Sequence, residues 1–341
     1  MGSPEVSDWF EQRWYGTNQP LRVLAPLEWL FNRVAKSRRQ AYASGKKPSY
    51  RAAVPVIIVG NISVGGTGKT PFTLWLLEVL RASGFRPGVV SRGYGGKAAE
   101  YPYEVTQHSP AAEAGDEPLM LVQRSGCPLV VDPDRGRAAA RLLELHDCDL
   151  IVSDDGLQHY ALARDIEIAV VDRLRGLGNG RCLPVGPLRE SVERLNQVDY
   201  VVLNGASGPF DHTGSFAMTL QPGVPCRFSG EEVELAPQSV HAVAGIGNPQ
   251  RFFDTLETLG YQVEPHAFPD HYKYREQDLN FHDNRPVLMT EKDAVKCRAF
   301  ATDNRYYLPV TAQLPLALTE KLIEQVEALA AHYANIRTTD G

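Results

Sequence analysis

The chain has 341 residues, more than one hydrophobic core usually holds, so two domains are expected. With 43% hydrophobic and 22% charged residues its composition is that of a globular protein, which excludes disordered and fibrous classes. The net charge of −6 argues against a nucleic-acid partner, because nucleic-acid-binding surfaces are broadly basic. The scattered cysteines favour reduced thiols in the cytosol, and no apolar run reaches the roughly 18 residues of a membrane span.

Residues 1–50 are predicted to form a basic amphipathic segment that associates with a membrane. Four apolar side chains recur at helical spacing on one face, namely Leu27, Leu30, Phe31 and Val34. No acidic residue lies between Glu28 and Arg51, whereas seven Lys and Arg residues follow Glu28 when Arg51 is included. Such a helix can lie against anionic headgroups, or it can pack on the protein and keep a solvated basic face. Upstream aromatic residues favour the membrane slightly: Trp9, Phe10, Trp14 and Tyr15.

Residues 51–208 alternate short apolar runs with helical stretches, which is typical of a parallel sheet covered by helices. Strands are predicted at 54–60, 88–91, 128–132, 149–154, 166–172 and 199–204, and helices at 70–83, 117–124 and 134–146. Residues 209–230 are rich in Gly, Pro and Ser and contain two strand-like pieces, so they predict a two-stranded linker. A second αβ alternation occupies residues 231–341 and ends in a helix near 319–334.

The stretch Ile57–Pro71, IIVGNISVGGTGKTP, predicts a phosphate-binding loop between a strand and a helix. Ser63 stands where the usual pattern has its first glycine, and the nearby glycines supply the freedom of the backbone. The predicted nucleotide-binding residues are Ser63, Val64, Gly65, Gly66, Thr67, Gly68, Lys69 and Thr70. Lys69 is expected to reach the β- and γ-phosphates, and the Thr70 hydroxyl to bind Mg²⁺. ATP is favoured because the guanine signature Asn/Thr-Lys-x-Asp has no match in the chain.

Acidic residues at the ends of buried strands are the remaining candidates for a Mg²⁺ site. The run CDLIVSDD ends in Asp154 and Asp155, which we favour as metal ligands over Asp132 and Asp172 at similar strand ends. The alternative is that one carboxylate of the pair caps the following turn.

Eight strings in series resemble one family, the tetraacyldisaccharide 4'-kinases (lipid A 4'-kinases) of Gram-negative bacteria. They are VGNISVGGTGKTP, SRGYGG, GDEPLM, DPDRGRAA, SDDGLQH, GNGRCLPVGPLRE, PDHY and LMTEKDAVKC. The resemblance implies an α/β fold: a P-loop NTPase-like α/β/α domain and a smaller C-terminal α/β/α domain, joined by a two-stranded linker. It implies ATP-dependent phosphorylation of the 4'-hydroxyl of tetraacyldisaccharide 1-phosphate, giving lipid IVA in lipid A biosynthesis. It also implies a peripheral protein on the cytoplasmic face of the inner membrane.

The resemblance also assigns roles to residues. It makes Asp116 the base for the sugar hydroxyl, coupled to His271 of the second domain, so that the two meet when the domains close. Without it, Asp116 would be a helix N-cap and His271 a packing or surface histidine. The resemblance also implies that five residues contact substrate or phosphate: Arg135, Arg137, His159, Arg92 and Glu117.

Two other functions are compatible with a phosphate-binding loop. The first is an ATPase switch that acts on a membrane-bound partner, although such proteins often carry a lysine where this chain has Val64. The second is a membrane-binding module that keeps ATP as a structural ligand, which would not need Asp116 and His271. No obligate protein partner is evident from the sequence.

Overall fold

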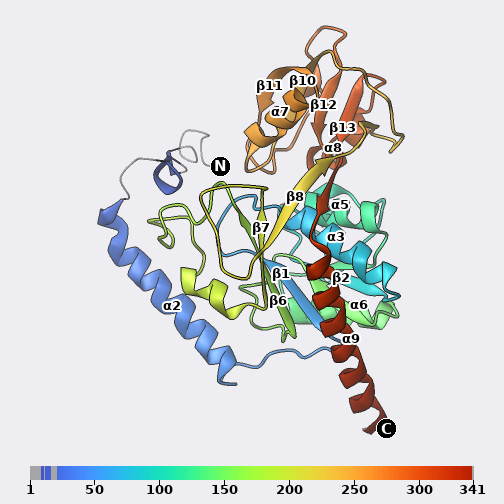
Figure 1. Cartoon of the computed structure of the whole chain (residues 1–341). Helices are drawn as coiled ribbons and strands as arrows, with labels where there is room; N and C mark the ends of the chain where they lie inside the picture. The colour runs from blue at the N-terminus through green and yellow to red at the C-terminus, as the bar shows by residue number, and fades with distance from the viewer. Residues whose placement is uncertain (1–8, 11, 17–20, 340–341) are drawn as a thin grey trace.

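The computed structural model describes residues 9–10, 12–16 and 21–339 and contains two β-sheets (Figure 1). The strands of the larger sheet are β1 (Val56–Gly60), β2 (Pro87–Ser91), β3 (Tyr103–Val105), β4 (Leu129–Val131), β5 (Leu150–Ser153), β6 (Ile166–Asp172), β7 (Tyr200–Asn204), β8 (Phe216–Pro222) and β14 (Val310–Gln313). Its order is β14-β8-β7-β6-β1-β5-β2-β4-β3, and only the β14–β8 and β3–β4 pairs are antiparallel. The predicted α/β class is confirmed, and all six strands predicted between 54 and 204 are present.

The central strand β1 is buried over its whole length because helices or loops cover both faces of the sheet. Ile57 and Val59 belong to one hydrophobic core, whereas Val56 and Ile58 belong to the core on the opposite face. A strand buried on both faces reads as a continuous apolar run, which is why its pattern was easy to recognise.

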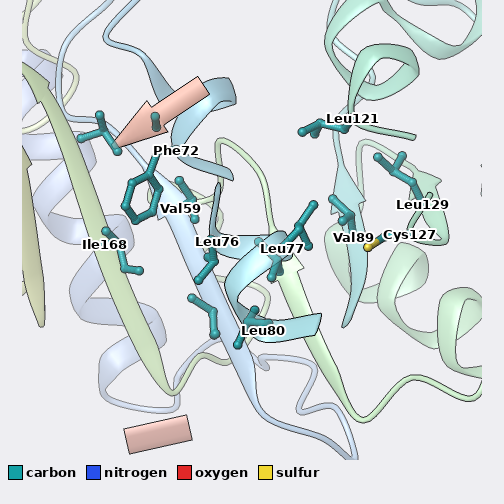
Figure 2. Packing of buried hydrophobic residues seen from close by; sticks show 14 of the residues in the cluster. Val59, Phe72, Leu76, Leu77, Leu80, Val89, Leu121, Cys127, Leu129 and Ile168 are labelled. Atoms are coloured by element: carbon teal, nitrogen blue, oxygen red, sulfur yellow. The ribbon is translucent and has the colours of Figure 1, made fainter. Parts of the chain in front are cut away.

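Helix α3 (Lys69–Ala82) follows the phosphate-binding loop and packs on the first of these cores. Figure 2 shows side chains of α3 between those of the central strands and those of the neighbouring helix and strands. Its fully buried apolar residues are Phe72, Leu76, Leu77 and Leu80. Each such side chain contributes about 1.5–3 kcal/mol by its burial, so this face fixes the helix and the loop at its N-terminus.

The other helices are α2 (Ala25–Ala43), α4 (Ala111–Ala114), α5 (Asp116–Ser125), α6 (Arg135–Leu145), α7 (Pro249–Thr258), α8 (Glu291–Cys297) and α9 (Leu316–Thr339), with 3-10 turns η1 (Arg22–Leu24), η2 (Val192–Gln197), η3 (Glu276–Leu279) and η4 (Arg298–Phe300). The smaller sheet contains β9 (Cys226–Arg227), β10 (Ser239–Ala244), β11 (Gln262–Ala267), β12 (Val287–Thr290) and β13 (Arg305–Leu308) in the order β11-β10-β12-β13-β9. It forms the second domain, above the first in Figure 1.

The two-stranded connection between the domains differs from the expectation that both strands lie within 209–230. Strand β8 pairs antiparallel with β14, whereas β9 joins the second sheet by pairing with β13. The physical reason is that the chain crosses between the domains twice, once outward along β8 and once back along β14. The two crossings therefore pair with each other.

The return crossing also changes the boundary of the second domain, which was expected to occupy 231–341. Helix α9 lies against the first domain (Figure 1), where Leu318, Leu322 and Val326 are fully buried in the same core as α3. Their spacing of four residues places them on one side of the helix. Strand β14 and helix α9 thus belong with the first domain instead of the second.

Helix α2 lies along the side of the first domain (Figure 1) and carries one buried acidic residue. Glu28 accepts hydrogen bonds from Arg181 Nε at 2.9 Å and from the backbone N–H of Cys182 at 2.8 Å. Of the four residues of the predicted apolar face, Phe31 packs on the body of the domain, and the others are 52–59% exposed. Within the described residues, no helix has both the length and the apolar character needed to cross a membrane.

Two of the upstream aromatic residues contact the protein itself. The indole N–H of Trp14 donates to the carbonyl of Pro184, and the Tyr15 hydroxyl donates to the carbonyl of Val64. These contacts correspond to the packed alternative for this part of the N-terminal segment. Trp9, in contrast, is 40% exposed.

Candidate active site

A cleft of about 590 Å³ lies between the two domains and is lined by residues of both. The phosphate-binding loop follows β1, and Lys292 of the second domain follows β12, so each sheet presents the carboxyl ends of its parallel strands. The domains are close together here. A Cβ built on Gly247 of the second domain would lie 2.8 Å from the backbone N of Gly66.

The phosphate-binding loop has the backbone that its glycines predict. Gly65 and Gly68 have φ values of 98° and 93°, and a Cβ on Gly68 would lie 2.2 Å from Asn204 Nδ2. Helix α3 begins at Lys69, so its N-terminal N–H groups face the loop and form an anion-binding site. Ser63 is not among the described residues with positive φ, which explains why this position does not require glycine.

Asp154 and Asp155 follow β5 and have different electrostatic environments. Asp155 lines the cleft, 3.5 Å from Lys69 Nζ and 3.1 Å from Arg189 Nη1. Although burial opposes ionisation, these two cations hold the pKa of Asp155 well below its ordinary value. Asp154 is fully buried, and burial together with the charges of Glu117 and Asp155 raises its pKa to about 7. Two adjacent carboxylates at the edge of a phosphate-binding loop supply the oxygen ligands that a divalent cation prefers.

Asp116 and His271 meet across the domain boundary. His271 Nδ1 lies 3.0 Å from each carboxylate oxygen of Asp116, which is 4% exposed. Burial opposes ionisation of both groups, yet their hydrogen bond lowers the pKa of Asp116 and raises that of His271. Asp116 does not cap its helix, because Gly115 is the N-cap and Asp116 is the first residue of α5. The pair therefore has the geometry of a carboxylate oriented by an imidazole.

Two lysines of α8 enter this cluster, and sequence reasoning gave neither of them a role. Lys292 Nζ lies 2.9 Å from Glu117 Oε1, 3.1 Å from Asp270 Oδ1 and 3.5 Å from His271 Nε2. Lys296 Nζ lies 3.7 Å from Asp116 Oδ2. Burial opposes the charge of Lys292, but the carboxylates of Glu117 and Asp270 raise its pKa above the ordinary value of a lysine. The signal that could have found them is their place directly after the buried strand β12.

A second bridge between the domains passes beneath the loop. Asn204 Nδ2 donates to the carbonyl of Thr67 at 3.0 Å, and Asn204 Oδ1 accepts from Arg251 at 2.9 Å. Arg251, on α7, also lies 3.6 Å from Asp172. Asp172 therefore lines the cleft as the partner of an arginine, although sequence reasoning had weighed it as a metal ligand.

Four of the predicted substrate contacts lie outside the cleft lining, and only Glu117 lies within it. Arg135 is buried and donates to the carbonyls of Asp132 and Asp154 at 3.0 and 3.3 Å. Arg137 pairs with the Asp132 carboxylate at 2.7 Å. Burial and the charge of Arg135 lower the pKa of His159 to about 4, so its imidazole is neutral.

The charges of three arginines, one of them on α2, act on this neutral imidazole. Arg92 is exposed, and its charge lowers the pKa of both Arg135 and His159, where burial is the larger cause. Arg38 of α2 also lowers the pKa of His159. We call Arg92, Arg135 and Arg38, with the neutral His159 among them, the basic region below.

Comparisons with known proteins agree with this architecture. The model of the LpxK family, described as tetraacyldisaccharide-1-P 4'-kinase, matches residues 20–327. The chain is 56% identical over 304 residues to the tetraacyldisaccharide 4'-kinase of Pseudomonas aeruginosa LESB58, covering 88% of this chain and 91% of that one. It is 55% identical over 313 residues to that of Pseudomonas fluorescens Pf-5, with coverage of 90% and 93%.

A solved structure is also similar. The "apo" form LpxK from Aquifex aeolicus, in complex with ATP, superposes with a TM-score of 0.75 at 30% identity. The match covers 89% of this chain and 98% of the Aquifex chain. The likeness thus extends over both domains.

Proposed function

The chain belongs to the tetraacyldisaccharide-1-P 4'-kinase family, and we propose that its interdomain cleft is where the 4'-hydroxyl of the acceptor receives the phosphate. The reaction of this kinase is transfer of the γ-phosphate of ATP to tetraacyldisaccharide 1-phosphate, which forms lipid IVA in lipid A biosynthesis. One observation carries the assignment of the site: the contact of Asp116 in the first domain with His271, which lines the cleft from the second domain.

Asp116 acts as the base in this proposal. Its lowered pKa keeps the carboxylate ionised at neutral pH, and a carboxylate can accept a proton late in a loose phosphoryl transfer. His271 holds that carboxylate in place from the second domain. Because the two residues lie 155 positions apart and in different domains, the base is complete only in the closed arrangement.

The phosphate-binding loop fits the triphosphate of ATP. Lys69 and the N–H groups at the start of α3 would bind the β- and γ-phosphates, and the tight contact of Gly68 with Asn204 fixes the loop in that shape. Thr70, Asp154 and Asp155 are the residues that would hold Mg²⁺, which supplies charge neutralisation between the phosphates when bound. The raised pKa of Asp154 supports this assignment because, after burial, its causes are the charges of Glu117 and Asp155, which a bound cation would offset.

Lys292 has a positioning role in the same proposal. It contacts Asp270 and His271 within the second domain and Glu117 in the first domain. The ion pair with Glu117 therefore joins the two domains. Closure therefore brings one more cation next to the site of phosphate transfer.

The basic region is the proposed place for the anionic part of the acceptor. Arg92 is exposed there, whereas Arg135 is buried against backbone carbonyls and supports the region through its charge. Arg137 is half-exposed and paired with Asp132, so it could exchange that partner for a phosphate. The acceptor would thus extend from α2 toward the cleft.

The exposed side of α2 is the proposed membrane contact. Leu27, Leu30 and Val34 are 53%, 52% and 59% exposed, while Glu28 fastens the opposite side to the domain. Basic residues of the helix can meet anionic headgroups around this apolar surface. A peripheral position at the cytoplasmic face of the inner membrane would bring the cleft to a lipid acceptor.

An ATPase switch acting on a membrane-bound partner is not favoured. A switch needs the phosphate-binding loop and the acids beside it, but it has no need of a carboxylate–imidazole pair that forms on closure. The family assignment points the same way.

The test is to incubate the protein with γ-labelled ATP, Mg²⁺ and detergent-dispersed tetraacyldisaccharide 1-phosphate. Label in the lipid is expected for the wild type. Asp116→Ala should lower turnover with little loss of ATP binding, whereas Lys69→Ala should weaken both. Label that appears only as free phosphate would contradict the kinase assignment, and full activity of Asp116→Ala would remove it as the base.

A further inference from the structure

A group of metal-ligating side chains lies in the second domain, apart from the residues that line the cleft. His241, Glu264 and His266 each offer one ligand atom, and these atoms lie within 4.8 Å of one another. His241 is on β10 and the other two are on the edge strand β11. None of the three takes part in the proposed phosphate transfer.

The sheet itself brings these residues together. Strands β10 and β11 are parallel, with His241 beside Glu264 and Val243 beside His266. Glu264 and His266 are two positions apart, so their side chains point to the same face as that of His241. The grouping thus follows from the register of the strands and does not depend on a mobile loop.

The distances suit a small tetrahedral ion. His241 Nδ1 lies 3.0 Å from His266 Nε2 and 3.8 Å from Glu264 Oε2, and His266 Nε2 lies 3.9 Å from Glu264 Oε1. Ligand bonds to zinc of about 2.0–2.1 Å place neighbouring ligand atoms about 3.3–3.4 Å apart in a tetrahedron. The three separations bracket that value, so binding requires shifts of only about half an ångström.

The outer ring nitrogen of His241 already has the partner that a metal-bound histidine usually has. Its Nε2 lies 3.1 Å from an oxygen of Asp283, and the His241 side chain is 2% exposed. An ionised carboxylate only accepts hydrogen bonds, so Nε2 carries the proton and the lone pair of Nδ1 points toward His266 and Glu264. A carboxylate behind a ligand histidine orients the ring and increases its basicity.

Two further groups hold the cluster in shape. The ring of Phe281 stacks on those of His241 and His266, with centroid distances of 4.1 Å in both cases. Arg285 lies 2.7 Å from Glu264 Oε2 and 2.7 Å from Asp283 Oδ2, which leaves Glu264 Oε1 directed at His266. Glu264 is half-exposed, so an ion can enter from solution.

We propose that His241, Glu264 and His266 form a zinc-binding site at the edge of the second domain, with Asp283 as the residue that orients His241. The donor set of two imidazoles and one carboxylate is one that zinc accepts, with a fourth position left for water. The competing interpretation is a metal-free network in which Arg285 alone balances the two carboxylates.

The test is calorimetric titration of the chelator-treated, full-length protein with ZnCl₂ in millimolar Mg²⁺, so that the carboxylates beside the phosphate-binding loop hold Mg²⁺. One Zn²⁺ per chain is expected. His266→Ala and Glu264→Gln should each weaken binding at least tenfold, and Asp283→Asn should weaken it by about 10–100-fold. The matched control is His108→Ala, which removes an exposed histidine of the first domain and should leave the affinity unchanged.

Co²⁺ provides an independent readout, because tetrahedral coordination should give visible absorption that His266→Ala abolishes. Circular dichroism of each variant distinguishes loss of ligand from loss of fold, and Glu264→Gln serves where His266→Ala does not fold. Absence of saturable binding to the wild type would overturn the proposal. Affinity that survives both His266→Ala and Glu264→Gln would also overturn it.

Discussion

The contact of Asp116 with His271 gives a prediction that separates the base from the residue that holds it. We consider Asp116→Asn, which is nearly isosteric with the carboxylate, His271→Ala, which removes the ring and its donor, and the double variant. His271 Nδ1 is 3.0 Å from both oxygens of Asp116, and the lowered pKa of Asp116 makes this a hydrogen bond to an ionised carboxylate in a largely buried place. Such hydrogen bonds contribute about 1.5–3 kcal/mol.

At about 1.36 kcal/mol for each factor of ten, His271→Ala should lower kcat by about 10–150-fold. Loss of a general base costs roughly 10²–10⁴-fold, so Asp116→Asn should be the more severe change. If His271 acts only through Asp116, the double variant should be no slower than Asp116→Asn alone. KM for ATP should stay nearly constant in all three, because neither residue belongs to the phosphate-binding loop.

The assay is transfer of label from γ-labelled ATP to the lipid acceptor under saturating ATP. Glu104→Gln is the matched control, since it removes the carboxylate of another acid–histidine pair, with His146 at 2.8 Å, on the surface of the first domain. That variant should keep wild-type turnover. Multiplicative losses in the double variant would refute the coupling, and wild-type kcat in Asp116→Asn would refute the role of base.

Three further outcomes are expected. Burial and neighbouring carboxylates raise the pKa of Asp154 to about 7, so this group destabilises the metal-free protein as pH rises from 3.8 toward 7. Asp154→Asn should therefore raise the melting temperature at pH about 8 without Mg²⁺. It should also reduce the increase in melting temperature that Mg²⁺ causes, as measured by scanning fluorimetry. Replacing Leu27 and Leu30 with Ser should reduce sedimentation of the protein with anionic vesicles at least tenfold, because each leucine contributes up to about 1.5–3 kcal/mol when it is buried in the membrane. The control variant Leu259→Ser, in the second domain, should sediment like the wild type. Burial opposes the charge of His271, but the bond to Asp116 raises its pKa above 6.5, so the stabilisation by this pair is complete below pH 6.5 and is lost as pH rises through the raised value. The difference in melting temperature between wild type and His271→Ala should therefore shrink over that range. A constant difference would contradict the ion pair.

Some features of the site could be predicted because their signals are local in the chain. The phosphate-binding loop is a strand, a glycine-rich turn and a helix in immediate succession, and β1 is a continuous apolar run because both its faces are buried. The acids Asp154 and Asp155 were visible for the same reason, as they directly follow a buried strand.

Other features had no local signal. Strand β11 is an edge strand with mostly exposed residues, so it lacked the apolar pattern by which strands are recognised. The pairing of β14 with β8 and the return of α9 to the first domain depend on how the chain crosses between domains. The residues of β14 and α9 do not by themselves indicate which of the two domains these elements pack against.

The sequence by itself determined the family, the α/β class and the loop that receives phosphate, because these rest on short-range patterns and on strings of adjacent residues. Only the tertiary structure decided which charges face one another. Lys292 reaches Glu117 from 175 residues away. Arg135 is buried against backbone carbonyls, although the resemblance to the family implied a contact to substrate or phosphate. Electrostatic interactions depend on distance in space and on burial, and both are set only when the two domains are packed together.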